Sequence, residues 1–200
     1  MMIEAVPPGA HVLDVGCAGG YLAQPLTAAG CVVDGVEPDA AAAESARAHC
    51  ATVTVGDYES PELRAALPAP FDTVVFGDVL EHLRDPWAAL AATAELLAPG
   101  ARVIASIPNI AHWSGRLALL RGRFSYAESG LFDATHLRFF TRRSAHELAK
   151  RAGYAVDREQ FTRGALPLAP TSVESAAARL RPELFALQFV LTLRPSASTR

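Results

Sequence analysis

The fold of this chain is decided by the stretch His11-Val12-Leu13-Asp14-Val15-Gly16-Cys17-Ala18-Gly19-Gly20. Its first half carries the short apolar run of a buried parallel strand, and its second half is rich in glycine. Residues 21–29 are predicted to form a helix, so the glycines lie at a strand-to-helix turn. The N-terminus of a helix exposes unpaired backbone N–H groups, and a glycine has no Cβ to keep a ligand away from them. We therefore expect a binding site for a polar ligand at this turn.

An acidic residue further along the chain indicates the kind of ligand. Residues 32–36 form a second apolar run, which ends at Glu37, 21 positions after Gly16. In a βαβ unit, a carboxylate at the end of the second strand lies beside the first loop and can accept hydrogen bonds from both hydroxyls of a ribose. The spacing therefore predicts a cofactor that contains a nucleoside.

These residues resemble a known family. The pattern Asp14-x-Gly16-Cys17-x-x-Gly20, followed by Glu37, is similar to the cofactor-binding half of the class I S-adenosylmethionine-dependent methyltransferases. The family usually has a glycine where this chain has Ala18, and alanine disfavours the positive φ that glycine allows. The alternative is a binder of a nicotinamide or another nucleotide on the same general plan, although the loop lacks the Gly-x-Gly-x-x-Gly pattern that accommodates a pyrophosphate.

Strands and helices alternate along the first half of the chain. Strands are predicted at residues 12–15, 32–36, 52–55, 71–76, 102–107, 154–161 and 184–193, and helices at 21–29, 40–50, 61–67, 86–97 and 141–153. This alternation indicates a three-layer α/β fold with a mostly parallel sheet and helices on both faces. By the resemblance, the sheet is Rossmann-like and its last strand is antiparallel. We expect one methyltransferase domain over residues 1–200.

The alternation breaks after residue 107. Residues 108–140 are too long for a simple connection, and they hold a predicted helix at 112–121 and a polar-aromatic run at 132–140. Long connections within compact domains are usually lids or binding loops. We interpret residues 108–140 as a lid or substrate-binding insertion. The arginines between Arg116 and Arg143 can hold an acidic acceptor, or they can belong to a solvated helix face.

The composition excludes several classes of function. The chain has 200 residues, half of them hydrophobic, and a net charge of −3, so it lacks the concentrated basic surface that general nucleic-acid binding needs. No apolar run approaches the roughly 20 residues that cross a bilayer, and we expect a soluble cytoplasmic protein with no membrane contact. The three cysteines show no Cys-x-x-Cys spacing, and we predict neither a disulfide framework nor a metal site.

The resemblance to the methyltransferases assigns residues to S-adenosylmethionine, whose product is S-adenosylhomocysteine. The glycine-rich loop approaches the methionine part, Glu37 holds the ribose, Asp57 bonds the adenine amino group and Tyr58 packs against the adenine ring. The segment at Gly77 and Asp78 passes beneath the sulfonium. The full set of predicted cofactor residues is Asp14, Gly16, Cys17, Ala18, Gly19, Gly20, Glu37, Pro38, Asp57, Tyr58, Gly77, Asp78 and Val79. Each feature alone is also typical of a tight bend, a solvated strand end or a turn, so the prediction depends on their order and spacing together.

A hydroxyl acceptor needs a base, and two histidines of the insertion are candidates. His136 is the first candidate, because Asp133 and Thr135 lie near it in the sequence and a carboxylate can orient an imidazole. The alternative is that His136 is a structural residue that holds the insertion to the sheet. His112 is the second candidate base.

We predict an S-adenosylmethionine-dependent methyltransferase that acts on a small-molecule acceptor. Residues 107–123 and the run at 136–141 resemble bacterial methyltransferases that modify polysaccharides and natural products, which implies O-methylation of a sugar or natural product. The chain is also similar to the methionine-biosynthesis protein MetW, which implies an alternative: a cofactor-binding protein that acts mainly through a partner enzyme. A second alternative, suggested by the short segment before the first strand, is a truncated or partner-dependent methyltransferase. It implies a homodimer in which residues of a neighbouring copy close the pocket.

Overall fold

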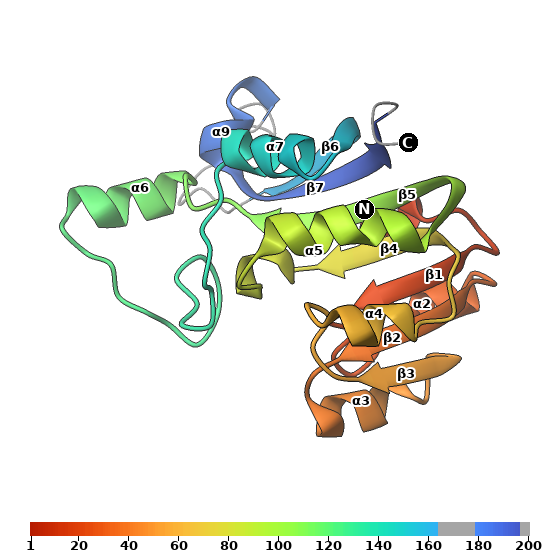
Figure 1. Cartoon of the computed structure of the whole chain (residues 1–200). Helices are drawn as coiled ribbons and strands as arrows, with labels where there is room; N and C mark the ends of the chain where they lie inside the picture. Colours follow the sequence, from red (N-terminus) through yellow and green to blue (C-terminus); the bar gives the residue numbers. More distant parts are fainter. Residues whose placement is uncertain (164–178, 197–200) are drawn as a thin grey trace.

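One mixed sheet forms the centre of the molecule (Figure 1). The computed structural model describes residues 1–163 and 179–196, and in this part of the chain the strands follow the order β3-β2-β1-β4-β5-β7-β6. The strands are β1 (His11–Val15), β2 (Val32–Glu37), β3 (Thr52–Val55), β4 (Phe71–Gly77), β5 (Leu97–Pro108), β6 (Tyr154–Arg163) and β7 (Ala186–Pro195). All pairs from β3 to β5 are parallel, whereas β7 is antiparallel to both β5 and β6. The predicted fold class, a mostly parallel α/β sheet with an antiparallel last strand, is confirmed.

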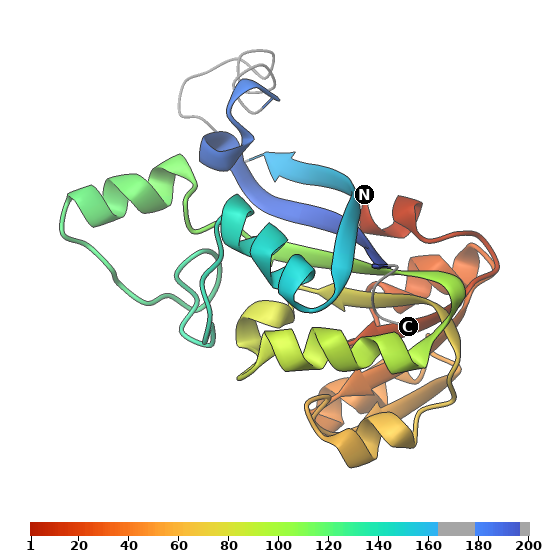
Figure 2. The same cartoon turned by 45° about the horizontal axis from the view of Figure 1, so that its top comes forward.

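Helices cover both faces of this sheet (Figure 2). They are α1 (Met2–Ala5), α2 (Ala23–Ala28), α3 (Ala40–Ala46), α4 (Pro61–Ala65), α5 (Pro86–Ala92), α6 (Trp113–Leu120), α7 (Arg142–Arg151) and α9 (Pro182–Phe185), with the short 3₁₀ turns η1 (Leu80–His82) and η2 (Thr93–Leu96). One buried cluster joins Leu13 of β1 to Leu90 of α5 and Leu148 of α7, and a second cluster joins Val12 to Leu26 of α2. Consecutive strand residues thus face opposite helix layers. Burial on both faces explains why the central strands β1 and β4 are mainly apolar in the sequence.

Side-chain caps begin several of the predicted helices. The Asp39 carboxylate accepts the N–H groups of Ala41 and Ala42 at 2.8 Å, and Asp85 caps α5 in the same way through Ala88. Thr141 begins α7 with a capping box. Each such cap stabilises a helix by about 1 kcal/mol because it satisfies backbone donors that have no partner within the helix.

The bounds of several elements differ from the sequence predictions. The predicted start of β5 at residue 102 is wrong, because the strand already pairs at Leu97 with Phe71 and shifts register before Arg102. Helix α2 begins two residues later than predicted, since the glycine-rich turn extends further. Helix α3 ends at Ala46 instead of Cys50, where a turn leads into β3. Helix α1 was not predicted.

The C-terminal strands differ from the predictions by small shifts. β6 continues to Arg163, two residues beyond its predicted end, and α9 occupies the beginning of the segment predicted as β7. Most of the Pro- and Ala-rich stretch at 166–182, which joins the last two strands in the sequence, and the last four residues of the chain lie outside the described residues.

The insertion leaves the sheet after β5 and returns before α7. Helix α6 and the loop after it project away from the sheet, as Figures 1 and 2 both show. The end of the insertion returns to the sheet, where the N–H groups of Leu137 and Arg138 both donate to the carbonyl oxygen of Glu81 at 2.9 Å. The insertion is therefore attached to the segment that follows β4.

No helix in the part of the chain that the structure describes is long and apolar enough to cross a membrane.

Candidate functional site

A cleft lies where the order of the strands reverses, between β1 and β4. The chain proceeds outward from β1 to β2 and β3, then crosses to the other side of β1, and ligands bind at the carboxyl ends of strands at such a switch point. The cleft, which we call the switch-point cleft, has a volume of about 530 Å³. Seven of the predicted cofactor residues line it: Gly16, Glu37, Pro38, Asp57, Tyr58, Asp78 and Val79. They lie at the carboxyl ends of β1, β2, β3 and β4, along one edge of the sheet.

The other predicted cofactor residues do not line this cleft. They are Asp14, Cys17, Ala18, Gly19, Gly20 and Gly77. The side chain of Cys17 is fully buried beside Gly35, and Gly20 packs against Ala46 and His49 at the end of α3. The structure therefore does not bring Cys17 or Gly20 to the cleft, because the loop turns its second half toward α3.

The backbone N–H groups of the glycine-rich loop are mostly bonded within the protein. Those of Gly16 and Cys17 donate to the carbonyl oxygen of Val36 at 2.7 and 3.1 Å, and that of Gly20 donates to Cys17. The expectation of unpaired N–H groups at these positions is wrong. The loop instead allows a close approach, because a Cβ on Gly16 would lie 2.6 Å from Cγ2 of Val79, and the φ of Gly16 is +67°.

Glu37 connects the second strand to the loop. Its Oε2 accepts the N–H of Ala18 at 2.8 Å and its Oε1 accepts the N–H of Asp39 at 3.0 Å. Ala18 adopts a φ of +46°, so it has the left-handed conformation that the glycine of the family pattern would take, at a cost of about 1–2 kcal/mol. The carboxylate of Glu37 stabilises this conformation and still has acceptor capacity toward the cleft, since two oxygens offer about four acceptor sites.

Asp14 is a buried carboxyl group without a partner. It is only 1% exposed, and neither oxygen accepts a hydrogen bond in the described part of the chain. Burial, and then the charge of Glu37, raise its pKa to about 7. An unpaired buried carboxylate is costly, so this position suits a ligand that carries a positive group.

Two neighbouring residues that line the cleft, Asp57 and Tyr58, also have partners within the protein. The hydroxyl of Tyr58 is hydrogen-bonded to Thr93 at 2.8 Å, and its ring packs edge-on against Phe76. Tyr58 is therefore buried in the wall, and burial raises the pKa of its hydroxyl to about 12. Asp57 is paired with the guanidinium of Arg84, which the sequence analysis did not select.

Asp78 is held in place by two other strands. Its N–H donates to Oγ of Ser106 at 2.9 Å, that hydroxyl donates to Oδ1 of Asp78 at 2.8 Å, and the Gln188 amide of β7 donates to the same oxygen. Asp78 has a φ of +56°, a strained conformation that is typical of functional positions. Gln188 was missed because its strand lies more than a hundred positions further along the chain.

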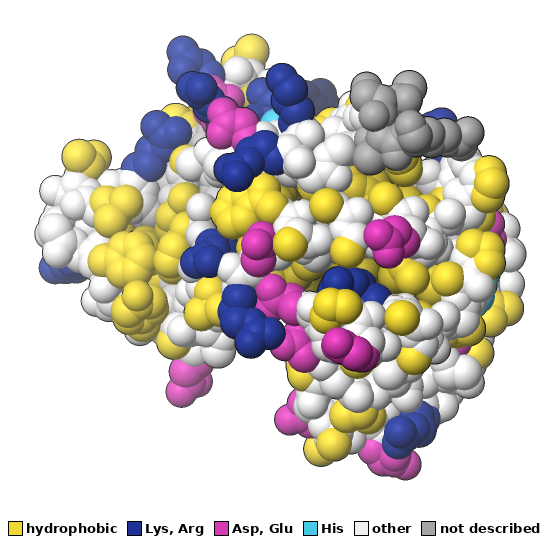
Figure 3. All heavy atoms as spheres, in the orientation of Figure 1, with side chains coloured by type: hydrophobic (Ala, Val, Ile, Leu, Met, Phe, Trp, Pro, Cys, Tyr) yellow, Lys and Arg dark blue, Asp and Glu magenta, His cyan; other side chains and the backbone are white. Residues whose placement is uncertain are grey.

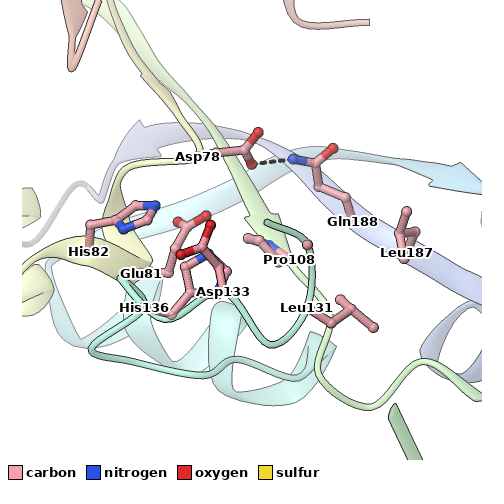
Figure 4. A pocket seen from close by; sticks show the side chains of 10 residues that line it. Asp78, Glu81, His82, Pro108, Leu131, Asp133, His136, Leu187 and Gln188 are labelled. Atoms are coloured by element: carbon pink, nitrogen blue, oxygen red, sulfur yellow. Dashed lines mark hydrogen bonds between the residues drawn. The ribbon is translucent and has the colours of Figure 1, made fainter. Parts of the chain in front are cut away.

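A second pocket adjoins the switch-point cleft. It has a volume of about 260 Å³, and we call it the insertion pocket because part of its wall is the insertion (Figure 4). Its lining comprises Asp78, Glu81, His82, Pro108, Gly130, Leu131, Asp133, His136, Leu187 and Gln188. Asp78 and His82 also line the switch-point cleft. Molecules bound in the two cavities would therefore meet at these two residues.

The predicted base His136 lies in the insertion pocket. Its Nδ1 is buried and has no hydrogen-bond partner in the described residues. Burial, and then His82 at a ring separation of 4.8 Å, lower the pKa of His136. Its imidazole is therefore neutral at pH 7 and able to accept a proton. His136 also packs against His82 in the turn after β4, and this contact is the basis of the alternative structural role.

The second candidate base, His112, does not line this pocket. It is buried at the start of α6, where its Nδ1 accepts the N–H of Ser114 and lies 2.7 Å from the Ser114 hydroxyl. Burial lowers its pKa. His112 therefore acts as a helix cap.

Glu81 is the main site residue that the sequence analysis did not select. It is 1% exposed, its two oxygens have no partner among the described residues, and burial raises its pKa to about 8, with smaller contributions from Asp78 and Asp133. The sequence does carry a sign of this residue, because Glu81 is an acidic residue within the mainly apolar run at 79–83.

Comparison with known proteins identifies the family. Residues 3–159 match the profile of a family described as "Methyltransferase domain". The chain therefore belongs to this family of methyltransferases, and the predicted class I identity is confirmed.

Curated relatives resemble part of the chain. The ubiquinone biosynthesis O-methyltransferases of Thiobacillus denitrificans and Xylella fastidiosa are each 39% identical to it over 105 residues. This stretch is 50% of the chain and 45% and 43% of those two proteins, so the similarity covers less than half of their length.

Solved structures share the fold over nearly the whole chain. The magnesium protoporphyrin IX methyltransferase of Synechocystis PCC 6803, with bound S-adenosylhomocysteine, has a TM-score of 0.63 at 21% identity, over 94% of this chain and 75% of its own. An S-adenosylmethionine-dependent methyltransferase from Mesorhizobium loti has a TM-score of 0.66 at 16% identity, over 96% of this chain and 95% of its own.

S-adenosylmethionine is the cofactor of this class, as predicted, and the residues of this chain fit it. The cofactor carries a cationic ammonium group and two ribose hydroxyls. The remaining acceptor capacity of Glu37, which lines the cleft, suits the hydroxyls. Asp14 is buried two residues before Gly16, outside the lining of the cleft, and its unpaired carboxyl is the acidic group of this segment that can attract the ammonium. Gly16 lets the backbone approach the cleft where a side chain would block it.

Proposed function

We propose that this domain transfers a methyl group from S-adenosylmethionine in the switch-point cleft to a hydroxyl group of a small molecule in the insertion pocket. The observation that carries the proposal is that the two cavities share Asp78 and His82. An in-line transfer needs donor and acceptor to be held side by side in a fixed orientation, which contributes much of the rate. Two adjoining cavities with a common wall provide that arrangement.

The protein has two chemical tasks in this reaction. Bound S-adenosylmethionine supplies the methyl group, which passes to the acceptor oxygen while the electron pair of the carbon–sulfur bond remains on sulfur. Glu37 holds the ribose, and Asp78, fixed by Ser106 and Gln188, lies where the cavities meet. The hydroxyl proton goes to the neutral imidazole of His136, whose Nδ1 has no other partner in the described residues.

Several observations favour an oxygen acceptor. The insertion pocket carries three carboxyl groups and two imidazoles, which can accept hydrogen bonds from hydroxyl groups. The partly similar relatives are named O-methyltransferases. Together with the resemblance of the insertion to enzymes that modify polysaccharides and natural products, these features support a sugar or a hydroxylated natural product as acceptor.

The experiment is to measure release of S-adenosylhomocysteine with a panel of monosaccharides, catechols and phenols, for the wild type, His136→Gln and His146→Gln. His146 lies on α7 and pairs with Glu159, outside both cavities, so its variant is the matched control. We expect His136→Gln to lower kcat by a factor of about 100 or more with little change in cofactor affinity. Unchanged kcat in His136→Gln would leave only the structural role for this residue.

A second candidate function is a role through a partner enzyme, as in the MetW alternative. Exposed apolar side chains on α6 and the following loop favour it, and Figure 3 shows them gathered at the projecting end of the molecule. They are Leu119, Leu120, Phe124 and Tyr126, of which Leu120 is 84% exposed. Cofactor binding without turnover on any acceptor, together with capture of one specific enzyme, would support this role. The expected homodimer and the cytoplasmic location remain predictions.

A further inference from the structure

Three side chains converge at the base of the insertion pocket. Glu81 and His82 come from the turn after β4, and His136 comes from the insertion; Figure 4 shows them side by side. Each offers one ligand atom, and the three atoms all lie within 4.8 Å of one another. His136 is far from Glu81 and His82 in the sequence, and only the spacing of the cysteines was used to look for a metal site. The sequence analysis therefore did not find this group.

The carboxyl groups that line the insertion pocket have no lysine or arginine beside them in the lining that the described residues form. Glu81 is buried with both oxygens unpartnered among the described residues, and Asp78 and Asp133 bring two more carboxyl groups into the same lining. A carboxyl group buried without a partner stays protonated unless a cation stabilises its charged form, and a bound cation would take the place of that proton on Glu81.

His82 is oriented as a metal ligand would be. Its Nδ1 lies 3.2 Å from both the carbonyl oxygen and the hydroxyl of Thr135. The carbonyl can only accept and the hydroxyl donates to Asp133, so both contacts favour the tautomer with the proton on Nδ1 and a free lone pair on Nε2. Metal-bound histidines commonly donate their second N–H to a carbonyl group in this way. Thr135 is itself held by Asp133, which accepts its N–H at 2.8 Å and its hydroxyl at 2.6 Å.

The backbone also fixes the two segments relative to each other. The carbonyl oxygen of Glu81 accepts the N–H groups of Leu137 and Arg138, one residue and two residues after His136. These two hydrogen bonds therefore fix the position of His136 relative to Glu81 in the turn after β4. A site of this kind needs little ordering when an ion binds.

We propose that Glu81, His82 and His136 bind one divalent transition-metal ion in the insertion pocket, with Zn²⁺ as the best match. Two imidazoles and one carboxylate are a typical ligand set for catalytic zinc, in which a fourth position stays open to water or substrate. Tetrahedral zinc ligands lie about 3.3 Å apart, so the ligand atoms, which lie within 4.8 Å of one another, would approach by at most about 1.5 Å through side-chain rotation. This proposal replaces the prediction that the chain has no metal site.

The ion would refine the proposed function, and this step rests on that function. An acceptor hydroxyl in the open position would lose its proton more readily, because a bound Zn²⁺ lowers the pKa of a coordinated hydroxyl or water. His136 would then be a ligand instead of the base. The proton would pass to solvent through the open side of the pocket.

The experiment measures the ion directly and does not depend on turnover. Protein freed of metal with a chelator is titrated calorimetrically with Zn²⁺, and in parallel with Co²⁺ followed by its visible absorption. The variants are Glu81→Gln, His136→Gln and the control His146→Gln. We expect one equivalent of Zn²⁺ to bind to the wild type and the control, and at least about tenfold weaker binding in the other two. Thermal melting with and without Zn²⁺ checks that each variant is folded, and only the wild type and the control should be stabilised.

Absence of Zn²⁺ and Co²⁺ binding in the folded wild type, or equal binding in all four proteins, would overturn the metal site. The turnover assay separates this result from the function. Full turnover after chelation, with loss in His136→Gln, would mean that His136 is the base and that the metal proposal fails. Metal binding as expected without any methyl transfer would keep the site and reject the proposed function.

Discussion

Replacing Asp14 by asparagine tests the balance between stability and cofactor binding at the end of β1. Asp14 is buried without a hydrogen-bond partner in the described residues, and burial raises its pKa from 3.8 to about 7. Asparagine has nearly the same shape and no charge. We expect Asp14→Asn to make the free protein more stable at pH 8 and to weaken the binding of S-adenosylhomocysteine.

The magnitude follows from the pKa. A carboxyl group whose pKa is raised in the folded state favours folding below its unfolded pKa, near 4, and this contribution is lost as the pH rises through about 7. A shift of about three units corresponds to about 4 kcal/mol. A buried amide without a partner also costs about 1–3 kcal/mol, so the net gain for Asp14→Asn at pH 8 is about 1–3 kcal/mol.

The assay is chemical denaturation of the free protein at pH 5 and at pH 8. Asp34→Asn is the matched control, because Asp34 is also buried but its oxygens contact His11 and the hydroxyl of Thr52, both at 2.6 Å. We expect Asp14→Asn to be stabilising at pH 8 and nearly neutral at pH 5, whereas Asp34→Asn is destabilising because it weakens the contacts of Asp34 with His11 and Thr52. A destabilised Asp14→Asn at pH 8, or the same effect at both pH values, would refute the reasoning.

Three further changes test the loop and its surroundings. Glu37→Ala should weaken binding of S-adenosylhomocysteine about 100-fold in calorimetry, since charge-assisted hydrogen bonds contribute about 1.5–3 kcal/mol each; unchanged affinity would reject its ribose role. Gly16→Val should abolish that binding in a protein that still folds by circular dichroism, because the new Cβ would lie 2.6 Å from Val79; retained binding would place the cofactor elsewhere. Asp39→Ala should lower the free energy of unfolding by about 1 kcal/mol through loss of the α3 cap, and an unchanged denaturation midpoint would contradict the cap.

The sequence predicted the parts of the fold that depend on local pattern. The apolar runs around Leu13 and Val33 are continuous because both faces of those strands are buried, so they indicated a parallel sheet directly. The predicted helix starts at residues 40 and 86 are confirmed, because the caps Asp39 and Asp85 act on the next few residues of the same chain. Glu37 could be placed beside the first loop because the carboxyl ends of parallel strands lie along the same edge of a sheet.

The parts that depend on distant contacts were not predicted. The extra length of β5 comes from pairing of Leu97 with Phe71, which no local pattern indicates. The contact of Gln188 with Asp78, and the convergence of His136 on Glu81, join segments that only the folded chain brings together. The N–H groups of Gly16 and Cys17 were expected to be free, because the sequence does not show that they meet the carbonyl oxygen of Val36 on another strand.

The measurement that tests the central claim most directly is calorimetric titration of the folded protein with S-adenosylmethionine and, separately, with S-adenosylhomocysteine. The account predicts that each binds at one site in the micromolar range, that they compete, and that Gly16→Val loses both. A protein that is folded by circular dichroism but binds neither would contradict the assignment of the switch-point cleft as the cofactor site.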